Sequence, residues 1–378
     1  MNTHVRVSTM TPAVLMLIAS SALAQAPTPP PPVVSPEIAA NRDVTLRLRA
    51  PAADRVELVS GGDIPAIPFN AGLAMSKTAD GVWQVMIPNL ASGAYRYRFD
   101  VDGVPTSDPG NPATSQSNAN AWSLFYVSGT EFMDAQRVAH GAVAEVTYYS
   151  PALGRDRRMH VYTPPGYERG RDSYPVFYLL HGAFDGDDSW STVGRAGFIL
   201  DNLIAARKAV PMIVVMPDGH QTRFNMNGGT RNFEAFVPEF ANDIRPYIEK
   251  NYRARADRAS TAIAGLSMGG AQTLDIAMSN LAGYAYVGVY SSGVFGIGDN
   301  SDWETKYRST LDDAALKRGL DLVWFSTGKD DFLIETTKGT VAMLERHGFD
   351  VTYQESTGGH TWINWREYLT KFAPELFR

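Results

Sequence analysis

Cysteine is absent from all 378 residues of the chain. The sequence therefore excludes disulfide bonds, thiol nucleophiles and a lipid-modified cysteine. A chain of this length can bury enough apolar surface to be stable without cross-links, and its length favours two domains over one. Acidic residues slightly outnumber basic ones, so the formal net charge is −6, and no basic stripe is present. This balance argues against a nucleic-acid partner.

The chain has no apolar run long enough to cross a bilayer. The run at residues 13–19 follows Arg6 and is too short to span a membrane. Ala22-Leu23-Ala24 fits a small-x-small cleavage site, so we predict that residues 1–24 are an export signal rather than an N-terminal membrane anchor. The proline-rich residues 25–36 are expected to form an extended linker. We therefore expect an exported protein, periplasmic or extracellular, with no membrane attachment after cleavage.

Residues 37–129 are predicted to be all-β. Turn dipeptides such as Asp80-Gly81 and Asp102-Gly103 separate short segments in which apolar and polar residues alternate. This spacing predicts a small immunoglobulin-like sandwich. Its aromatic residues could contact sugar rings, but alternating aromatics in strands usually fill a core. The alternating apolar positions are Val44, Leu46, Leu48, Trp83, Val85, Ile87, Tyr95, Tyr97, Phe99 and Val101.

In residues 140–378 the pattern is different, and buried strands are expected to alternate with helices. This succession predicts an α/β fold with a mostly parallel central sheet and helices on both faces. We expect strands at residues 158–162, 174–180, 213–216, 261–264, 322–326 and 351–354, and helices at 194–207, 233–248, 271–278 and 341–348.

The pattern Gly265-Leu266-Ser267-Met268-Gly269 lies between an apolar strand and a helix. In that context, G-x-S-x-G describes a strained turn that exposes a serine hydroxyl at the tip of a sheet. We therefore predict that Ser267 is a nucleophile and that the Met268 N–H faces developing negative charge. The alternative is an ordinary turn between a strand and a helix.

A base and an acid should follow Ser267. Of the seven histidines, only His347 and His360 follow Ser267 in the sequence, and His347 fits the exposed C-terminal end of an amphipathic helix. His360 follows the last strand in a loop of glycines and tryptophans, so it is the predicted base. The acid should follow the strand at 322–326, where spacing alone does not choose between Asp330 and Asp331.

A second oxyanion donor should follow the strand at 174–180. Gly182 permits an unusual turn there that could aim the N–H of Ala183 or Phe184 at the oxyanion. His181 is interpreted as structural, holding this loop.

Residues 141–378 resemble the α/β-hydrolases of carbohydrate esterase family 1, which include feruloyl esterases and acetyl xylan esterases. Residues 37–129 resemble, through fewer residues, the early-set immunoglobulin-like domains related to glycogen-binding modules. The family's Gly-x-x-Asp element implies Asp331 as the acid. Family members often carry more glycine after His-Gly than this chain does, which leaves the second donor and the width of the acyl pocket open. The matching elements are Tyr178 to Gly182, Gly194 to Ala196, Asp201 to Ala205, Pro211 to Pro217, Ala264 to Gly270, Gly328 to Asp331 and Gly358 to Trp362.

The resemblance implies a serine esterase that hydrolyses acyl esters of plant cell-wall polysaccharide and needs no metal or organic cofactor. Feruloyl esters of xylan are the favoured substrate, and acetylated xylan is the second candidate. The chain could also be a siderophore esterase, an acyltransferase or a non-catalytic glycan-binding protein, and the oligomeric state stays open. Aromatic residues that could bind the substrate are Phe184, Trp190, Trp362 and Trp365.

Overall fold

The computed structural model describes Met1 and residues 31–68, 71–222, 235–295 and 302–378. Nearly all of the predicted export signal, and Phe233 at the start of one predicted helix, lie outside these ranges. In the part of the chain that is described, no helix is long and apolar enough to cross a membrane.

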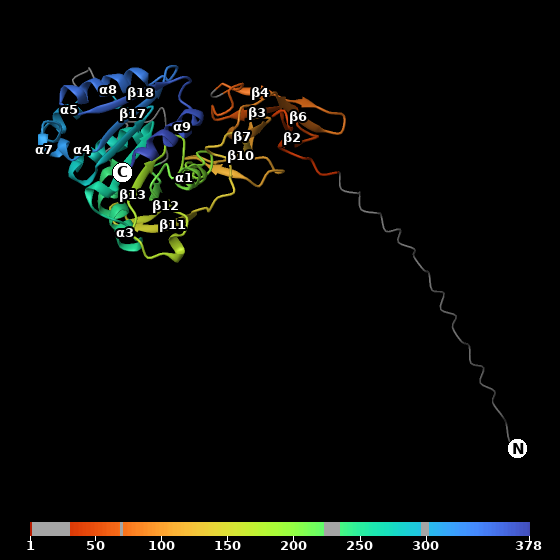
Figure 1. Ribbon diagram of the computed structural model, residues 1–378. Coiled ribbons are helices and arrows are strands. Elements are labelled where there is room, and N and C mark those ends of the chain that lie inside the picture. Colours follow the sequence, from red (N-terminus) through yellow and green to blue (C-terminus); the bar gives the residue numbers. More distant parts are fainter. Residues whose placement is uncertain (2–30, 69–70, 223–234, 296–301) are drawn as a thin grey trace. The chain divides into compact units, whose positions relative to one another are not determined.

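The N-terminal β region consists of two sheets (Figure 1). They share a core in which the three aromatic side chains at residues 95, 97 and 99 are fully buried. These rings are therefore core residues and cannot contact a sugar. One sheet has the order β1 (Glu37–Ile38), β2 (Val44–Arg49), β6 (Val82–Ile87), β5 (Ser76–Lys77). The other has the order β4 (Gly72–Ala74), β3 (Val56–Ser60), β7 (Gly93–Val101), β10 (Ala121–Val127), β9 (Thr114–Gln116), with β8 (Val104–Thr106) also paired to β7.

An eight-stranded sheet forms the centre of the C-terminal region (Figure 1). Its first two strands run antiparallel, and all strands from β14 to β18 pair in parallel, as the alternation of strands and helices predicted. Nearly every side chain in its central strands is buried. The order is β11 (Ala142–Ser150), β12 (Arg155–Thr163), β14 (Ile213–Pro217), β13 (Val176–Leu180), β15 (Thr261–Leu266), β16 (Tyr286–Tyr290), β17 (Leu322–Gly328), β18 (Val351–Ser356).

Two apolar cores cover the two faces of this sheet. In β13, Tyr178 belongs to one core and Phe177 to the other, because successive side chains point to opposite faces. Helices α3 (Arg245–Asn251), α4 (Met268–Ser279) and α8 (Ile334–Arg346) contribute to the first core. Helices α1 (Ala196–Ala205) and α9 (Trp362–Phe372) contribute to the second. The helices thus cover both faces, as an α/β-hydrolase requires.

Most predicted elements are present with shifted ends. The helix expected at 233–248 is described as a continuous run from α2 (Phe236–Glu239) through a π-helical turn, η3 (Phe240–Ile244), into α3. Strands β11 and β16 and helix α9 were not predicted. Three short helices were not predicted either: α5 (Asp302–Lys306), α6 (Arg308–Leu311) and α7 (Ala314–Arg318).

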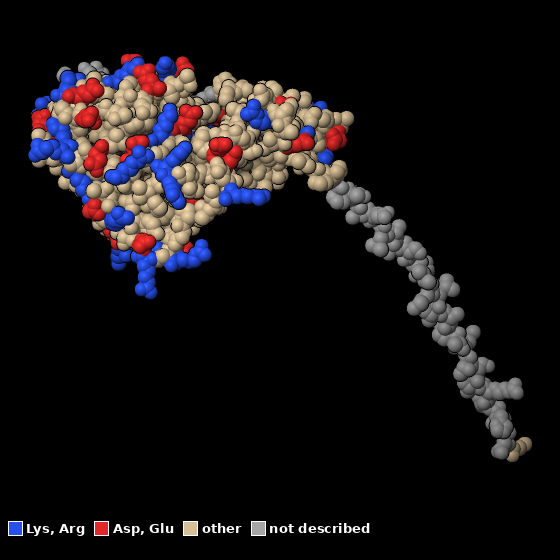
Figure 2. All heavy atoms as spheres, viewed as in Figure 1, with Lys and Arg blue, Asp and Glu red and all other residues tan. Residues whose placement is uncertain are grey.

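The β region has its own core, but part of it also packs into one of the two cores of the α/β region, and residues 33–378 form a single compact unit. Ala94 of β7 and Met133 are buried in the same apolar cluster as the inner faces of α1 and α9. On the face seen in Figure 2, acidic and basic side chains are interspersed and no basic stripe is visible.

Candidate active site

Ser267 joins β15 to α4 in a strained backbone conformation. Its φ is 51° and its ψ is −119°, values that a side chain with a Cβ rarely adopts. The two glycines of the motif explain how this turn closes. A Cβ on Gly265 would lie well inside 3.0 Å of the Gly269 carbonyl, and a Cβ on Gly269 would lie 2.5 Å from the His181 carbonyl oxygen. The turn therefore has no room for larger residues at either position.

A hydrogen-bonded chain runs from Ser267 to His360 to Asp331. His360 Nε2 lies 3.0 Å from Ser267 Oγ. His360 Nδ1 lies 3.0 Å from each carboxylate oxygen of Asp331. The three residues follow β15, β18 and β17 respectively, so the carboxyl ends of three parallel strands bring them together. This is the arrangement in which an imidazole can take the proton of a serine hydroxyl.

Asp331 is buried, whereas its neighbour Asp330 is exposed. Burial raises the pKa of Asp331, but hydrogen bonds from His360 and from the Leu333 N–H, with the charge of the imidazole, outweigh burial and leave the pKa below its ordinary value. Asp331 is therefore the carboxylate that faces the histidine, and it is ionised at neutral pH.

The loop that carries His360 is fixed to the end of β17. The Asp330 N–H donates to the Gly358 carbonyl at 3.0 Å, and a Cβ on Gly328 would collide with that same carbonyl. Trp365 adds support, because its ring meets the imidazole edge-on at 5.0 Å between centroids. Its Nε1–H donates to Ser291 Oγ at 3.0 Å. These contacts limit the positions that the imidazole can adopt.

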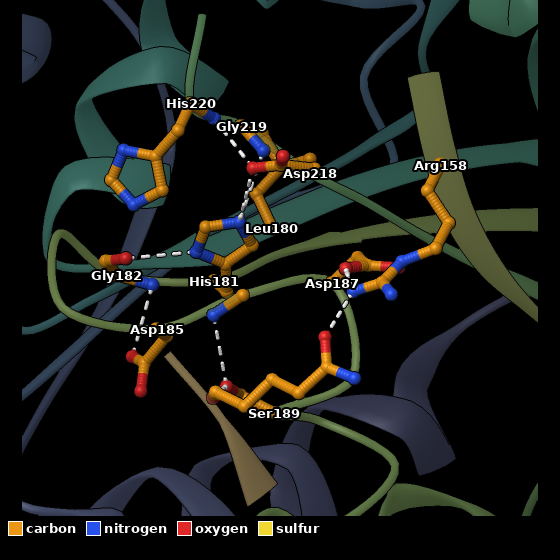
Figure 3. Close-up of polar contacts among 12 residues, drawn as sticks. Arg158, Leu180, His181, Gly182, Asp185, Asp187, Ser189, Asp218, Gly219 and His220 are labelled. Carbon is orange, nitrogen blue, oxygen red and sulfur yellow. Dashed lines mark hydrogen bonds and ion pairs between the residues drawn. The ribbon is translucent and has the colours of Figure 1, made fainter. Parts of the chain in front are cut away.

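The loop after β13, residues 181–185, lies against the turn at Ser267, because a Cβ on Gly182 would lie 3.5 Å from Ser267 Cβ. Figure 3 shows His181, Gly182 and Asp185 of this loop. His181 is buried, donates from Nδ1 to the Gly182 carbonyl at 2.8 Å and accepts the Gly219 N–H at Nε2 at 3.0 Å. This ring holds the loop and does not reach the reacting groups. The Gly182 N–H donates to Asp185 Oδ2 at 3.3 Å, and the Asp185 N–H donates to the Gly182 carbonyl at 3.2 Å. These two bonds close the loop into a tight turn.

Both predicted oxyanion donors border Ser267. Met268 is the first residue of α4 and directly follows the serine. Ala183 follows Gly182, where an added Cβ would lie 3.5 Å from Ser267 Cβ. The loop after β13 and the N-terminus of α4 therefore flank the serine together.

The predicted aromatic substrate wall is largely buried. Trp190 and Trp362 are each only 1% exposed and pack edge to face at 5.0 Å. Trp365 is 6% exposed, so of the four predicted rings only Phe184, at 46%, is open to solvent. The two tryptophans at 190 and 362 form part of the apolar core behind the site. As placed here they cannot wall an acyl pocket, which corrects that part of the prediction.

Phe332 is a site residue that was not predicted from the sequence. It directly follows Asp331, is 75% exposed, and its ring centroid lies 4.4 Å from that of His360. The available signal was an apolar residue inside a polar turn, immediately after the candidate acid. An exposed aromatic ring at this place can contact a substrate held at Ser267.

Comparisons with known proteins agree with this geometry. Residues 150–376 match the family model described as "Putative esterase". An endo-1,4-beta-xylanase/feruloyl esterase of Xylanibacter ruminicola is 30% identical over 88% of this chain, and the chain spans 44% of that relative's length. A CE1 ferulic acid esterase of Anaeromyces mucronatus, solved with ferulic acid, is 25% identical with a TM-score of 0.57, over 66% of this chain and 96% of its own.

A fourth similarity, to another solved structure, extends over the N-terminal β region. The enterobactin esterase of Shigella flexneri has a TM-score of 0.62 over 89% of this chain and 92% of its own. Its identity of 17% supports a shared fold and no more. The predicted esterase resemblance and the α/β-hydrolase fold are both confirmed by these comparisons.

Proposed function

Because the chain belongs to the family described as "Putative esterase", we propose that it is an exported serine esterase. We propose that it hydrolyses acyl esters of plant cell-wall polysaccharide, above all feruloyl esters of xylan. The observation that carries the proposal is the chain of 3.0 Å contacts from Ser267 Oγ through His360 to the buried Asp331. Its functional parts are a β-sandwich at residues 37–129 and a catalytic domain at residues 140–378.

The first half of the reaction forms an acyl-enzyme. His360 Nε2 takes the Ser267 proton as Oγ attacks the ester carbonyl carbon. The carbonyl oxygen becomes an oxyanion and accepts hydrogen bonds from the N–H groups of Met268 and Ala183, each worth about 3 kcal/mol. Asp331 stabilises the imidazolium and keeps the Nδ1 proton in place. The ester bond then breaks, and the leaving alcohol takes the proton from Nε2.

The second half releases the acid. His360 removes a proton from water, whose oxygen attacks the acyl carbon. The tetrahedral intermediate collapses, the acyl–oxygen bond to Ser267 breaks, and Oγ recovers its proton from the imidazolium. Every step uses groups of this chain, the substrate and water.

Two features favour a hydroxycinnamoyl acyl group over acetate. One is the pair of exposed rings, Phe332 against His360 and Phe184 on the loop after β13. An aromatic acyl group can stack on such rings, whereas an acetyl group gains little from them. The other is that a relative at 30% identity carries feruloyl esterase in its name.

A substrate panel tests the proposal. Wild type and Ser267→Ala are compared on methyl ferulate, acetylated xylan and a short nitrophenyl ester. We expect release of ferulate by wild type, and a loss of at least about 10⁴-fold in turnover by the variant with its melting temperature retained. Equal turnover in the variant would reject the serine mechanism, and a strong preference for acetyl groups would favour an acetyl xylan esterase.

The three less favoured functions, acyltransferase, siderophore esterase and glycan-binding protein, are each tested by a different measurement. Transfer of ferulate to excess sugar would indicate an acyltransferase, and cleavage of an iron-chelate lactone would indicate a siderophore esterase. Retention on a glycan column without any turnover would indicate a binding protein. N-terminal sequencing of the protein recovered outside the cytoplasm tests cleavage after Ala24.

A further inference from the structure

Through its carboxylate, Asp185 forms hydrogen bonds with three parts of the molecule: the loop after β13, helix α9 and strand β7. Its carboxylate is 4% exposed, and Oδ2 accepts the Gly182 N–H that closes the loop after β13 (Figure 3). The other oxygen, Oδ1, accepts the Trp362 Nε1–H at 3.3 Å. Trp362 lies two residues after His360. One carboxylate therefore fixes both the loop with the second oxyanion donor and the start of the helix behind the base.

The cation that balances Asp185 comes from the N-terminal β region. Arg96 lies in β7, is 6% exposed, and donates from Nη1 to Asp185 Oδ1 at 2.7 Å. Its Nε donates to Asp63 Oδ2 at 2.8 Å. Burial lowers the pKa of Arg96, but the two carboxylates raise it further, so the guanidinium is always charged. The buried guanidinium of Arg96 thus forms ion pairs with two buried carboxylates, those of Asp63 and Asp185.

Loss of this cation would act directly on the loop. Asp185 would then be a buried carboxylate without its ion-pair partner, an arrangement that proteins relieve by protonation or by movement. A proton on Asp185 weakens its hold on the Gly182 N–H, and movement of Asp185 displaces the same amide. Either change alters the path of residues 182–184 beside Ser267.

We propose that Arg96 is a positioning residue for ester hydrolysis, which acts through Asp185 to hold the oxyanion loop in its productive conformation. The proposal rests on the proposed function for its catalytic consequence. It assigns the N-terminal β region a part in catalysis that requires no contact between that region and the substrate.

The test compares Arg96→Met, Arg96→Lys and Asp185→Asn with wild type on a nitrophenyl ester. For Arg96→Met we expect kcat to fall about 30-fold with KM changed less than about twofold, because a displaced donor affects the transition state more than substrate binding. Lysine keeps the charge and should restore a large part of kcat. The double variant Arg96→Met/Asp185→Asn should be no slower than the slower single variant, because both changes break one linkage.

Asn202→Ala is the matched control. Its side-chain amide donates to the carbonyls of Glu131, Phe132 and Asp134, so it also joins α1 to the segment after β10, but it does not touch residues 181–185. We expect this variant to lose melting temperature and keep wild-type kcat. Hydrogen exchange at residues 181–186 should be faster in Arg96→Met and unchanged in Asn202→Ala.

The outcomes separate this proposal from the proposed function. A folded Arg96→Met with wild-type kcat would overturn the positioning role, whatever its stability. If that variant does not fold, a folded Asp185→Asn with wild-type kcat would overturn it. An inactive wild type would reject the esterase assignment instead. In that case, hydrogen exchange at residues 181–186 that is the same in Arg96→Met as in wild type would count against the role of Arg96 in ordering the loop.

Discussion

At the scale of single residues, Phe332 is the side chain whose position is hardest to explain by folding. Single exposed apolar residues are common on proteins. This one, however, lies against His360 and directly follows Asp331, so its exposed ring borders the reacting groups. A ring kept open to solvent at this place is best explained by contact with a substrate.

Phe332→Ala should therefore change selectivity more than chemistry. We expect kcat/KM for methyl ferulate to fall about tenfold, which is the loss of about 1.4 kcal/mol of stacking and apolar contact, while hydrolysis of a nitrophenyl acetate changes little. Parallel assays on the two esters measure this ratio.

The control for that experiment is Tyr149→Ala, which removes a ring that is 61% exposed on β11. It should leave both esters unaffected. Equal losses on both esters in Phe332→Ala would show that the ring supports the imidazole and does not select the acyl group.

A second single residue, His220, is expected to lower the free energy of unfolding in weak acid. Burial and the neighbouring His181 ring lower the pKa of His220 to about 4, from an ordinary value of 6.5. Between these two values the unfolded chain binds a proton that the folded chain does not, so the free energy of unfolding falls as the pH falls. This single residue contributes about 3 kcal/mol to that loss.

His220→Asn should flatten the pH dependence. Urea titrations of both proteins at pH 7, 5.5 and 4 give the free energy of unfolding, and the difference between pH 7 and pH 4 should be smaller in the variant. Parallel curves for the two proteins would show that His220 is protonated in the folded state.

The site residues differ in how well the sequence predicts them. Ser267 and His360 were predictable, because the glycine spacing of an elbow and the order of the histidines are local features of the chain. The choice of Asp331 needed the family resemblance. The orientation of aromatic residues was not predictable, since only packing decides that Trp362, at the start of α9, is buried and that Phe332, in the turn after β17, is exposed.

At the scale of elements, the elbow between β15 and α4 depends on backbone contact more than on side chains. Gly265→Ala would push a Cβ into the Gly269 carbonyl, so either the strand end or the helix start must move. We expect a loss of about 3 kcal/mol or more in the free energy of unfolding, together with loss of turnover.

Gly197→Ala is the matched control for this element. Gly197 lies in α1, and an added Cβ would meet Val143 and Tyr162 at 3.7 and 3.8 Å, which is ordinary contact. Alanine favours a helix by about 0.5–1 kcal/mol over glycine, so this variant should be as stable as wild type or more stable. Chemical denaturation of the two variants side by side tests the difference.

Most central strands and the helices α1, α4 and α8 were predictable, because their apolar pattern extends over several turns or pleats, whereas β11, β16 and α9 were not predicted. The short helices α5, α6 and α7 span five residues or fewer, too short for a period to be recognised. The ends of β1, β4, β5, β8 and β9 are set by pairing with neighbours, which the local sequence does not contain.

At the scale of the whole molecule, the β region and the α/β region are joined by a buried interface. Ala94 and Met133 pack with α1 and α9, and Arg366 of α9 donates to the carbonyls of Ala94 and Val193 at 3.2 and 2.8 Å. The sequence predicted two domains, and it contained no sign that residues 89 positions apart, Arg96 and Asp185, would form an ion pair.

This interface predicts that residues 33–378 unfold together. Differential scanning calorimetry should show one cooperative transition, because opening either region exposes the shared core and leaves buried charges without partners. Two resolved transitions, or an isolated fragment of residues 140–378 with full turnover and unchanged stability, would contradict this expectation.

The guanidinium at position 96 also limits how the protein could be re-engineered. Modular enzymes are often rebuilt by exchanging the accessory module in front of a catalytic one. Here a replacement module would have to bring its own positive group to the same point behind the active-site turn, or the graft would fold around an uncompensated acid. The boundary at which this chain can be divided therefore does not coincide with the change from β to α/β architecture.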